Sequence, residues 1–91
     1  MLQLYVIKDN KSGGFQAPQF FKNVADCLRT LQLHMEEGKS MLAKFPSDFS
    51  LYFVGSFDET SGFLYPTAEA GPQHTLELVE LMKGKVNNEQ A

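Results

Sequence analysis

Residues 50–66, SLYFVGSFDETSGFLYP, carry the clearest structural signal in the chain. The alternation over residues 50–58 predicts a strand. One face of this strand would carry Leu51, Phe53, Gly55 and Phe57, with Tyr52 and Val54 on the other. The polar run at residues 58–62, DETSG, supplies a tight connection, and FLYP supplies the return strand, which ends at Pro66. The stretch therefore predicts a β-hairpin.

A second hairpin is predicted at the start of the chain. Residues 2–9, LQLYVIKD, alternate between an aliphatic and a mixed face, which is typical of a strand. NKSGG follows at residues 10–14 and contains turn residues that tolerate positive φ. The return strand is expected at about residues 14–17, with Pro18 ending it or confining it to an edge.

Helical periodicity appears after each hairpin. Residues 20–38, FFKNVADCLRTLQLHMEEG, predict a helix with Asn23 as its N-cap and Gly38 as its stop. Its apolar face would carry Val24, Cys27, Leu28, Leu31 and Met35. A short helical turn capped by Ser40 is expected before Pro46. HTLELVELMKG, residues 74–84, predicts a last helix that ends at Gly84.

The predicted order β-β-α-β-β-α indicates an α+β fold. A chain of 91 residues has room for one domain. We expect a single domain over residues 1–86, with an antiparallel sheet of two hairpins and helices packed on one face. A frayed tail is expected over residues 87–91. The two halves are alike in element order but not in residues, and the sequence does not fix the strand order.

Composition limits the class of protein. A hydrophobic fraction of 43% argues against intrinsic disorder. No apolar run approaches the ~18–20 residues of a membrane span, and the first residues lack a basic segment and cleavage site. We therefore expect neither a membrane span nor a secretory signal. The single cysteine, Cys27, excludes an internal disulfide and fits a reducing compartment.

Few residues suggest catalysis. His34 and His74 are the only histidines, and neither has a ligand-spaced partner. His74 is expected to lie at the start of the last helix. Cys27 falls on an apolar helix face, where a thiol behaves as a small hydrophobe. Phosphate-binding glycine motifs are absent. We expect no catalytic residue, no metal site and no cofactor.

Nucleic-acid binding would have to come from a local surface, because the net charge is −3. The candidate phosphate contacts are Lys8, Lys11, Lys22 and Arg29, and the candidate stacking residues are Tyr5 and Tyr52. Together with Tyr65, these tyrosines would share an exposed sheet face. The alternative interpretation is that the tyrosines pack across strands and the lysines only keep the protein in solution.

Protein binding is the other interpretation. The chain has more large apolar side chains than so small an interior requires, and short hairpin edges invite a partner strand. A homo-oligomer, with a dimer favoured, is therefore expected. The apolar side chains concerned are Phe15, Phe20, Phe21, Phe45, Phe49 and Phe63.

The ordered features resemble the small nonstructural protein of gokushoviruses and related microviruses, which are single-stranded DNA phages. The resemblance covers most of residues 1–66. It rests on the turn at residues 9–13, on Pro18 with two phenylalanines, on a helix matching residues 23–29, and on a long block at residues 44–62. That block reads K-x-P-x-D-(Y/F)-x-L-(Y/F)-x-(L/V/I)-G-x-F-D-x-x-T-G in the family. Here the last glycine falls one place later.

The resemblance implies a nonstructural DNA-binding protein, made in the cytoplasm of infected bacteria and likened to the coliphage C protein. From it we expect a nonenzymatic protein that binds single-stranded DNA and assists genome replication, the switch to single-strand synthesis, or packaging. The alternative is an adaptor that docks on the viral replication initiator or the procapsid without touching DNA. Direct DNA contact is favoured if the four basic residues lie on one surface; their dispersal among carboxylates would count heavily against it and favour a protein target.

Overall fold

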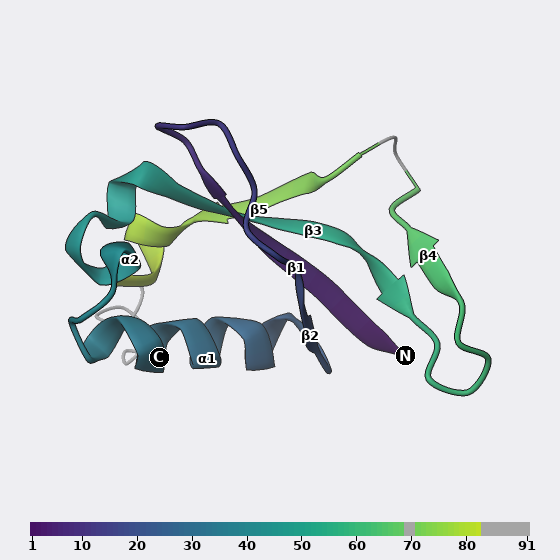
Figure 1. The fold of residues 1–91 in the computed structure, drawn as a ribbon. Helices are drawn as coiled ribbons and strands as arrows, with labels where there is room; N and C mark the ends of the chain where they lie inside the picture. The colour runs from purple at the N-terminus through teal and green to yellow at the C-terminus, as the bar shows by residue number, and fades with distance from the viewer. Residues whose placement is uncertain (69–70, 83–91) are drawn as a thin grey trace.

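The computed structural model of the chain describes residues 1–68 and 71–82 and has an α+β fold, which confirms the predicted class. Two strands and two helices come first, followed by a short 3₁₀ turn and three more strands (Figure 1). Residues 78–82 are helical. The elements are β1 (Leu2–Asp9), β2 (Gln19–Phe21), α1 (Val24–Glu36), α2 (Met41–Lys44), η1 (Pro46–Asp48), β3 (Phe49–Phe57), β4 (Leu64–Pro66) and β5 (Gln73–Glu77).

Strands β1 and β3 form the centre of one antiparallel sheet. They pair from Leu2 opposite Phe57 to Asp9 opposite Phe49. The order across the sheet is β2-β1-β3-β4, and β5 also pairs with β3. Strand β1 occupies one edge of β3. The other edge of β3 is therefore shared by β4 and β5. β4 pairs with residues 55–57 of β3 and β5 pairs with residues 50–53.

Both hairpins use the same five-residue turn, Asp-x-x-Ser-Gly, at residues 9–13 and 58–62. In each turn the aspartate Oδ1 accepts backbone N–H bonds from the second and third residues that follow, at 2.9–3.4 Å. The glycine N–H donates to the aspartate carbonyl, and Gly13 and Gly62 both have φ of +83°. The halves are therefore alike in residues at this point, contrary to the sequence interpretation.

The helices cover one face of the sheet, as predicted (Figure 1). Helix α1 begins after Asn23, whose side chain accepts the Asp26 N–H at 2.8 Å, and Gly38 follows it with φ of +74°. Ser40 caps α2. The predicted caps are thus confirmed. The core lies between the two layers and contains Tyr5, Cys27, Leu31, Met35, Leu42, Phe49, Leu51, Leu78 and Leu81.

A β-bulge in β3 corrects the predicted strand faces. Leu4 pairs with Gly55 and Tyr5 pairs with Phe53, so Val54 is an extra residue. Leu51 and Phe53 accordingly face the helices, whereas Gly55 and Phe57 lie on the opposite face. Gly55 meets β4 closely: a Cβ there would lie 2.5 Å from the Tyr65 carbonyl oxygen. Only glycine fits this register.

Two predicted elements are wrong. The return strand expected at residues 14–17 is reduced to one bridge, between Lys8 and Phe15, and β2 forms after Pro18. Proline lacks the N–H that would continue the pairing. The helix expected over residues 74–84 begins only at residue 78, because residues 73–77 pair with the edge of β3 that the short β4 leaves open. Residues 83–84, the predicted domain end at residue 86 and the predicted tail lie outside the described residues.

Candidate functional site

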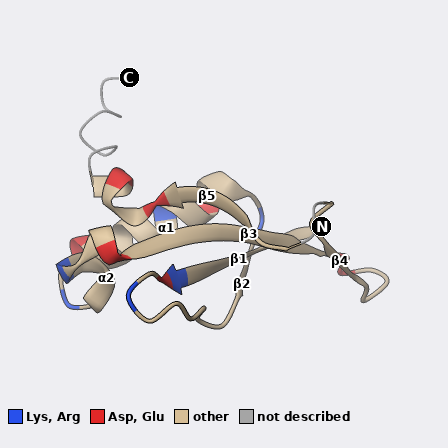
Figure 2. Cartoon of the chain, turned by 90° about the horizontal axis from the view of Figure 1, so that it is seen from above, with Lys and Arg blue, Asp and Glu red and all other residues tan. Residues whose placement is uncertain are grey.

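The sheet face opposite the helices has no layer of its own in the described part of the chain (Figure 2). The alternation of strand side chains and the pairing register decide which residues it carries. Val6 lies opposite Tyr52, which in turn lies opposite His74, and Lys8 lies opposite Phe15 in the segment after the first turn. Aromatic rings therefore line up across neighbouring strands on the uncovered face.

Lys8, Phe15, Tyr52 and His74 form what we call the lysine–aromatic cluster. The Tyr52 ring makes edge-to-face contacts with Phe15 at 5.5 Å and with His74 at 5.4 Å between centroids. The Lys8 ammonium lies 5.6 Å from the Phe15 centroid and 6.0 Å from that of Tyr52. Phe15 remains 48% exposed. The cluster thus offers π surface and one cation to a ligand.

A chain of hydrogen bonds through the buried Ser50 hydroxyl holds the cluster in place. Buried Ser50 accepts from the Asn10 amide and donates to Glu77, both at 2.8 Å, and Glu77 lies 2.7 Å from the His74 ring. This chain joins the first turn, β3 and β5. The Ser50 hydroxyl, followed by His74, lowers the pKa of the Glu77 carboxyl below its ordinary 4.5.

We expect Ser50→Ala to lower the free energy of unfolding by about 1–2 kcal/mol at pH 7, because two hydrogen bonds are lost. A lowered folded-state pKa stabilises the protein only while Glu77 is ionised. The difference in the free energy of unfolding between Ser50→Ala and the wild type should therefore become smaller as the pH falls below 4.5. Urea unfolding at neutral and acid pH measures this difference, with Ser56→Ala in the same strand as the control. A Ser50→Ala difference that stays constant with pH would contradict the prediction.

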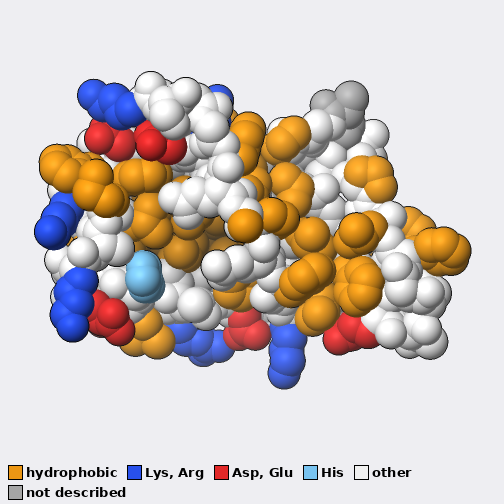
Figure 3. Space-filling view, in the orientation of Figure 1, with side chains coloured by type: hydrophobic (Ala, Val, Ile, Leu, Met, Phe, Trp, Pro, Cys, Tyr) orange, Lys and Arg blue, Asp and Glu red, His pale blue; other side chains and the backbone are white. Residues whose placement is uncertain are grey.

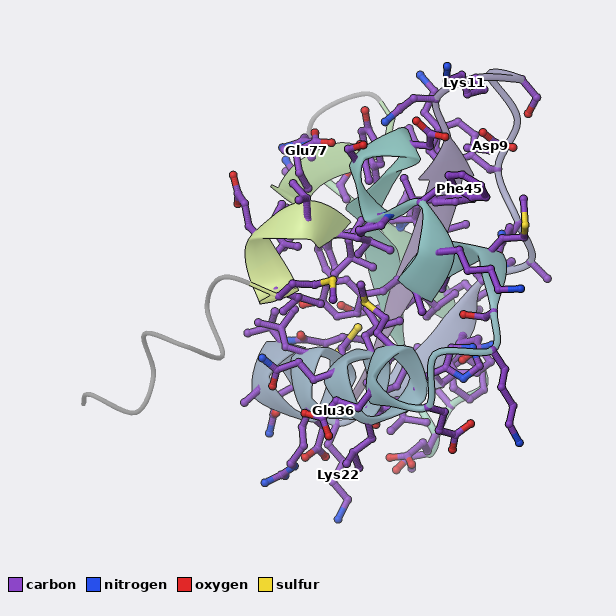
Figure 4. All side chains as sticks on the ribbon, turned by 90° about the vertical axis from the view of Figure 1, so that its left-hand side faces the viewer. Asp9, Lys11, Lys22, Glu36, Phe45 and Glu77 are labelled. Atoms are coloured by element: carbon purple, nitrogen blue, oxygen red, sulfur yellow. The ribbon has the colours of Figure 1, made fainter. Side chains whose placement is uncertain are left out.

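The predicted cations do not form one surface. Lys11 lies in the turn after β1, and Figure 4 shows it at the opposite end of the molecule from Lys22. Arg29 is on the exposed side of α1, with its Nη2 atom 2.7 Å from the Asp26 carboxylate. Asp9 accepts the backbone N–H of Lys11 at 3.0 Å. The four cations therefore do not form the predicted electropositive stripe. Of the four, Lys8 belongs to the cluster and Lys11 lies in the turn that follows the same strand.

The predicted stacking role of Tyr5 is wrong. Tyr5 is 6% exposed and faces the helices, where it packs against Phe21 and Phe53. Because side chains alternate along a strand and Val6 pairs with Tyr52, Tyr5 lies on the other face of the sheet from Tyr52. Tyr65 pairs with Ser56 and is not beside the cluster either. Tyr52 is partly exposed within the cluster. Sequence reasoning missed His74 as its neighbour, because the segment was assigned to a helix.

No activated nucleophile accompanies the cavity that the helices form with the segment before β2. This cavity, of about 200 Å³, lies between α1, α2 and residues 16–19, and Cys27 and His34 line it. Burial raises the pKa of the Cys27 thiol to about 12, so the thiol stays protonated. Within residues 1–68 and 71–82, no three metal-ligating side chains gather. No helix in these ranges is long and apolar enough to cross a membrane.

Comparison with known proteins gives one match. Neither the curated proteins nor the solved structures contain a significant relative. The model of one protein family, described as Phage ORF5 protein, matches residues 2–81 and so spans every described element of the sheet. The phage origin implied by the sequence resemblance is thereby confirmed. The chain belongs to the Phage ORF5 protein family.

Proposed function

We propose that the chain is a nonenzymatic phage protein that binds single-stranded DNA on the uncovered face of its sheet. It would act in the cytoplasm of infected bacteria and assist genome replication, the switch to single-strand synthesis, or packaging. The resemblance to gokushovirus nonstructural proteins supports this context. The observation that carries the proposal is the lysine–aromatic cluster, with Phe15 half exposed beside Tyr52.

Stacking supplies most of the affinity in this proposal. Proteins that bind single strands place bases on aromatic side chains, at about 1–3 kcal/mol per base, and contact the backbone with cations. Phe15 and Tyr52 provide the rings, and the Lys8 ammonium above them is placed to meet a phosphate. Lys11 is exposed in the same hairpin. Lys22 and Arg29 have no part in this revised site.

Two phosphate contacts give a small salt dependence, which tests the proposal. The logarithm of the binding constant for labelled oligothymidine should fall against the logarithm of salt concentration with a slope of about −1.4, or −0.7 per contact. Lys11→Ala should reduce the slope to about −0.7, whereas the matched variant Lys22→Ala should leave it unchanged. Equal changes in both variants would contradict the site. Absence of binding at about 50 mM salt would contradict DNA binding altogether.

The second candidate is a protein adaptor that docks on the replication initiator or the procapsid. Dispersal of the cations favours it, because the net charge of −3 gives a polyanion no general attraction. Figure 2 shows basic and acidic segments distributed over different elements. Capture of the viral initiator or procapsid by the immobilised chain, without oligonucleotide binding, would support the adaptor over the first proposal.

A further inference from the structure

Two aromatic pairs straddle β1 on the uncovered face of the sheet. One is Phe15 with Tyr52, in the lysine–aromatic cluster, and the other is Phe20 with Phe57. The ring centroids are 5.5 Å apart in both pairs. In each pair one ring comes from either side of β1. Because the two strands that flank a shared neighbour lie about 9–10 Å apart, the rings of each pair lean toward each other over β1.

Two side chains of β1 are buried on this face, although the helices cover the other one. Leu4 is 9% exposed and Val6 is 5% exposed. Leu4 pairs with Phe20 on one side and with Gly55 on the other. Since Gly55 has no side chain, the Phe20 ring extends across Leu4 toward Phe57. The Phe20–Phe57 pair therefore covers Leu4, while Phe20 itself stays 50% exposed.

We propose that Phe20 and Phe57 form a second base-stacking subsite, so that one strand of DNA lies along β1 and stacks a base on each aromatic pair. This inference rests on the proposed function and extends its surface. Phe15 lies opposite Lys8 in β1. Phe20 lies opposite Leu4, so the two pairs are four residues, or about 13 Å, apart along β1. At 3.4 Å per stacked nucleotide, this distance corresponds to about four steps, and the ligand is a single strand of about five nucleotides or more.

The second subsite offers stacking without a cation. Leu4 and Val6, which lie between the two pairs, are uncharged. Figure 3 shows hydrophobic side chains gathered over the ends of β1, β3 and β4, whereas Lys and Arg lie at the other end and along the lower edge. The next residue after Phe57 is Asp58, whose carboxylate would repel a phosphate, so the path ends there. Stacking at Phe20 should therefore add affinity without changing the salt slope of binding, which counts phosphate contacts.

Fluorescence anisotropy at low salt tests the proposal with a short labelled oligothymidine of about 3 nucleotides, which spans one pair, and a long one of about 8, which reaches both. Phe20→Ala should weaken binding of the long strand by about fivefold or more, which is the loss of one stacked base. It should leave the salt slope and the affinity for the short strand unchanged, because the short strand binds beside Lys8. Phe20→Leu keeps an apolar cover over Leu4 without a ring and should behave like Phe20→Ala. Circular dichroism melting checks that both variants are folded.

Phe63→Ala is the matched control. The residue change is the same and Phe63 is 63% exposed, but its ring contacts Tyr65, which pairs with Ser56 and lies on the other face of the sheet. This variant should bind both strands like the wild type.

Three results would overturn the second subsite: equal affinity of Phe20→Ala and Phe63→Ala for the long strand, equal weakening of both strand lengths by Phe20→Ala, or full affinity of Phe20→Leu for the long strand. In each case the proposed function stands if Phe15→Ala still weakens binding of both strands. A wild type that binds neither strand would contradict the proposed function itself.

Discussion

Replacing Leu78 by alanine is expected to lower the free energy of unfolding by about 2–5 kcal/mol. Leu78 is the first helical residue after β5, and its exposure is 0%. It belongs to the same core cluster as Cys27 and Leu51. Truncation there removes buried apolar surface and leaves a cavity that the surrounding side chains fill only in part. For a chain of this size the loss is a large part of a total stability of roughly 5–13 kcal/mol.

Urea unfolding followed by circular dichroism measures this change. Leu33→Ala is the matched control, because Leu33 lies on the exposed side of α1 and its truncation should stay within about 0.5 kcal/mol of the wild type. Similar small effects for the two variants would show that the segment after β5 is not part of the core. The placement of His74 beside Tyr52 would then lose its support, since β5 is continuous with Leu78.

Sequence patterns predicted the elements whose signals are local. The helix at residues 20–38 carried its own caps, Asn23 and Gly38, and its apolar spacing, so α1 could be predicted nearly to the residue. The second hairpin was equally local, because its strands flank one polar turn. Local signals of this kind do not depend on where the rest of the chain lies.

Strand β5 could not be predicted in this way. Leu76, Val79 and Met82 suit a helix, and residues 78–82 are indeed helical, but residues 73–77 are drawn into the sheet. The cause is tertiary: β4 pairs with only three residues of β3, and the remaining edge would otherwise leave backbone groups unpaired next to the core. A partner strand outweighs a weak helical preference.

The candidate site was predicted in part for a similar reason. Tyr52 was identified, but its neighbours come from three separate segments whose pairing the sequence does not fix. Tyr5 belongs to the mixed face of its strand, and the alternation alone does not show that this face, rather than the aliphatic one, packs against the helices. The four cations are close in sequence, yet α1 carries Arg29 away from the first hairpin. Proximity along the chain was a poor guide to a shared surface.

Phe15→Ala is expected to weaken binding of oligothymidine by about 5- to 150-fold, which corresponds to the loss of one stacked base at about 1–3 kcal/mol. Phe15 is 48% exposed and follows the turn after β1, so its truncation leaves the core between the sheet and the helices intact. Fluorescence anisotropy at low salt measures the dissociation constant. Phe15→Trp should retain or improve affinity, because the larger ring offers more π surface.

Two further variants separate stacking from general hydrophobic attraction. Phe15→Leu keeps an apolar side chain without a ring and should bind nearly as weakly as Phe15→Ala. Phe63→Ala removes a ring that is more exposed than Phe15, at 63%, but follows the second turn and contacts Tyr65 rather than Tyr52. It should leave DNA affinity unchanged. If Phe63→Ala reduced DNA affinity as much as Phe15→Ala, binding would reflect nonspecific contact with exposed aromatics, and the lysine–aromatic cluster would not be the DNA site.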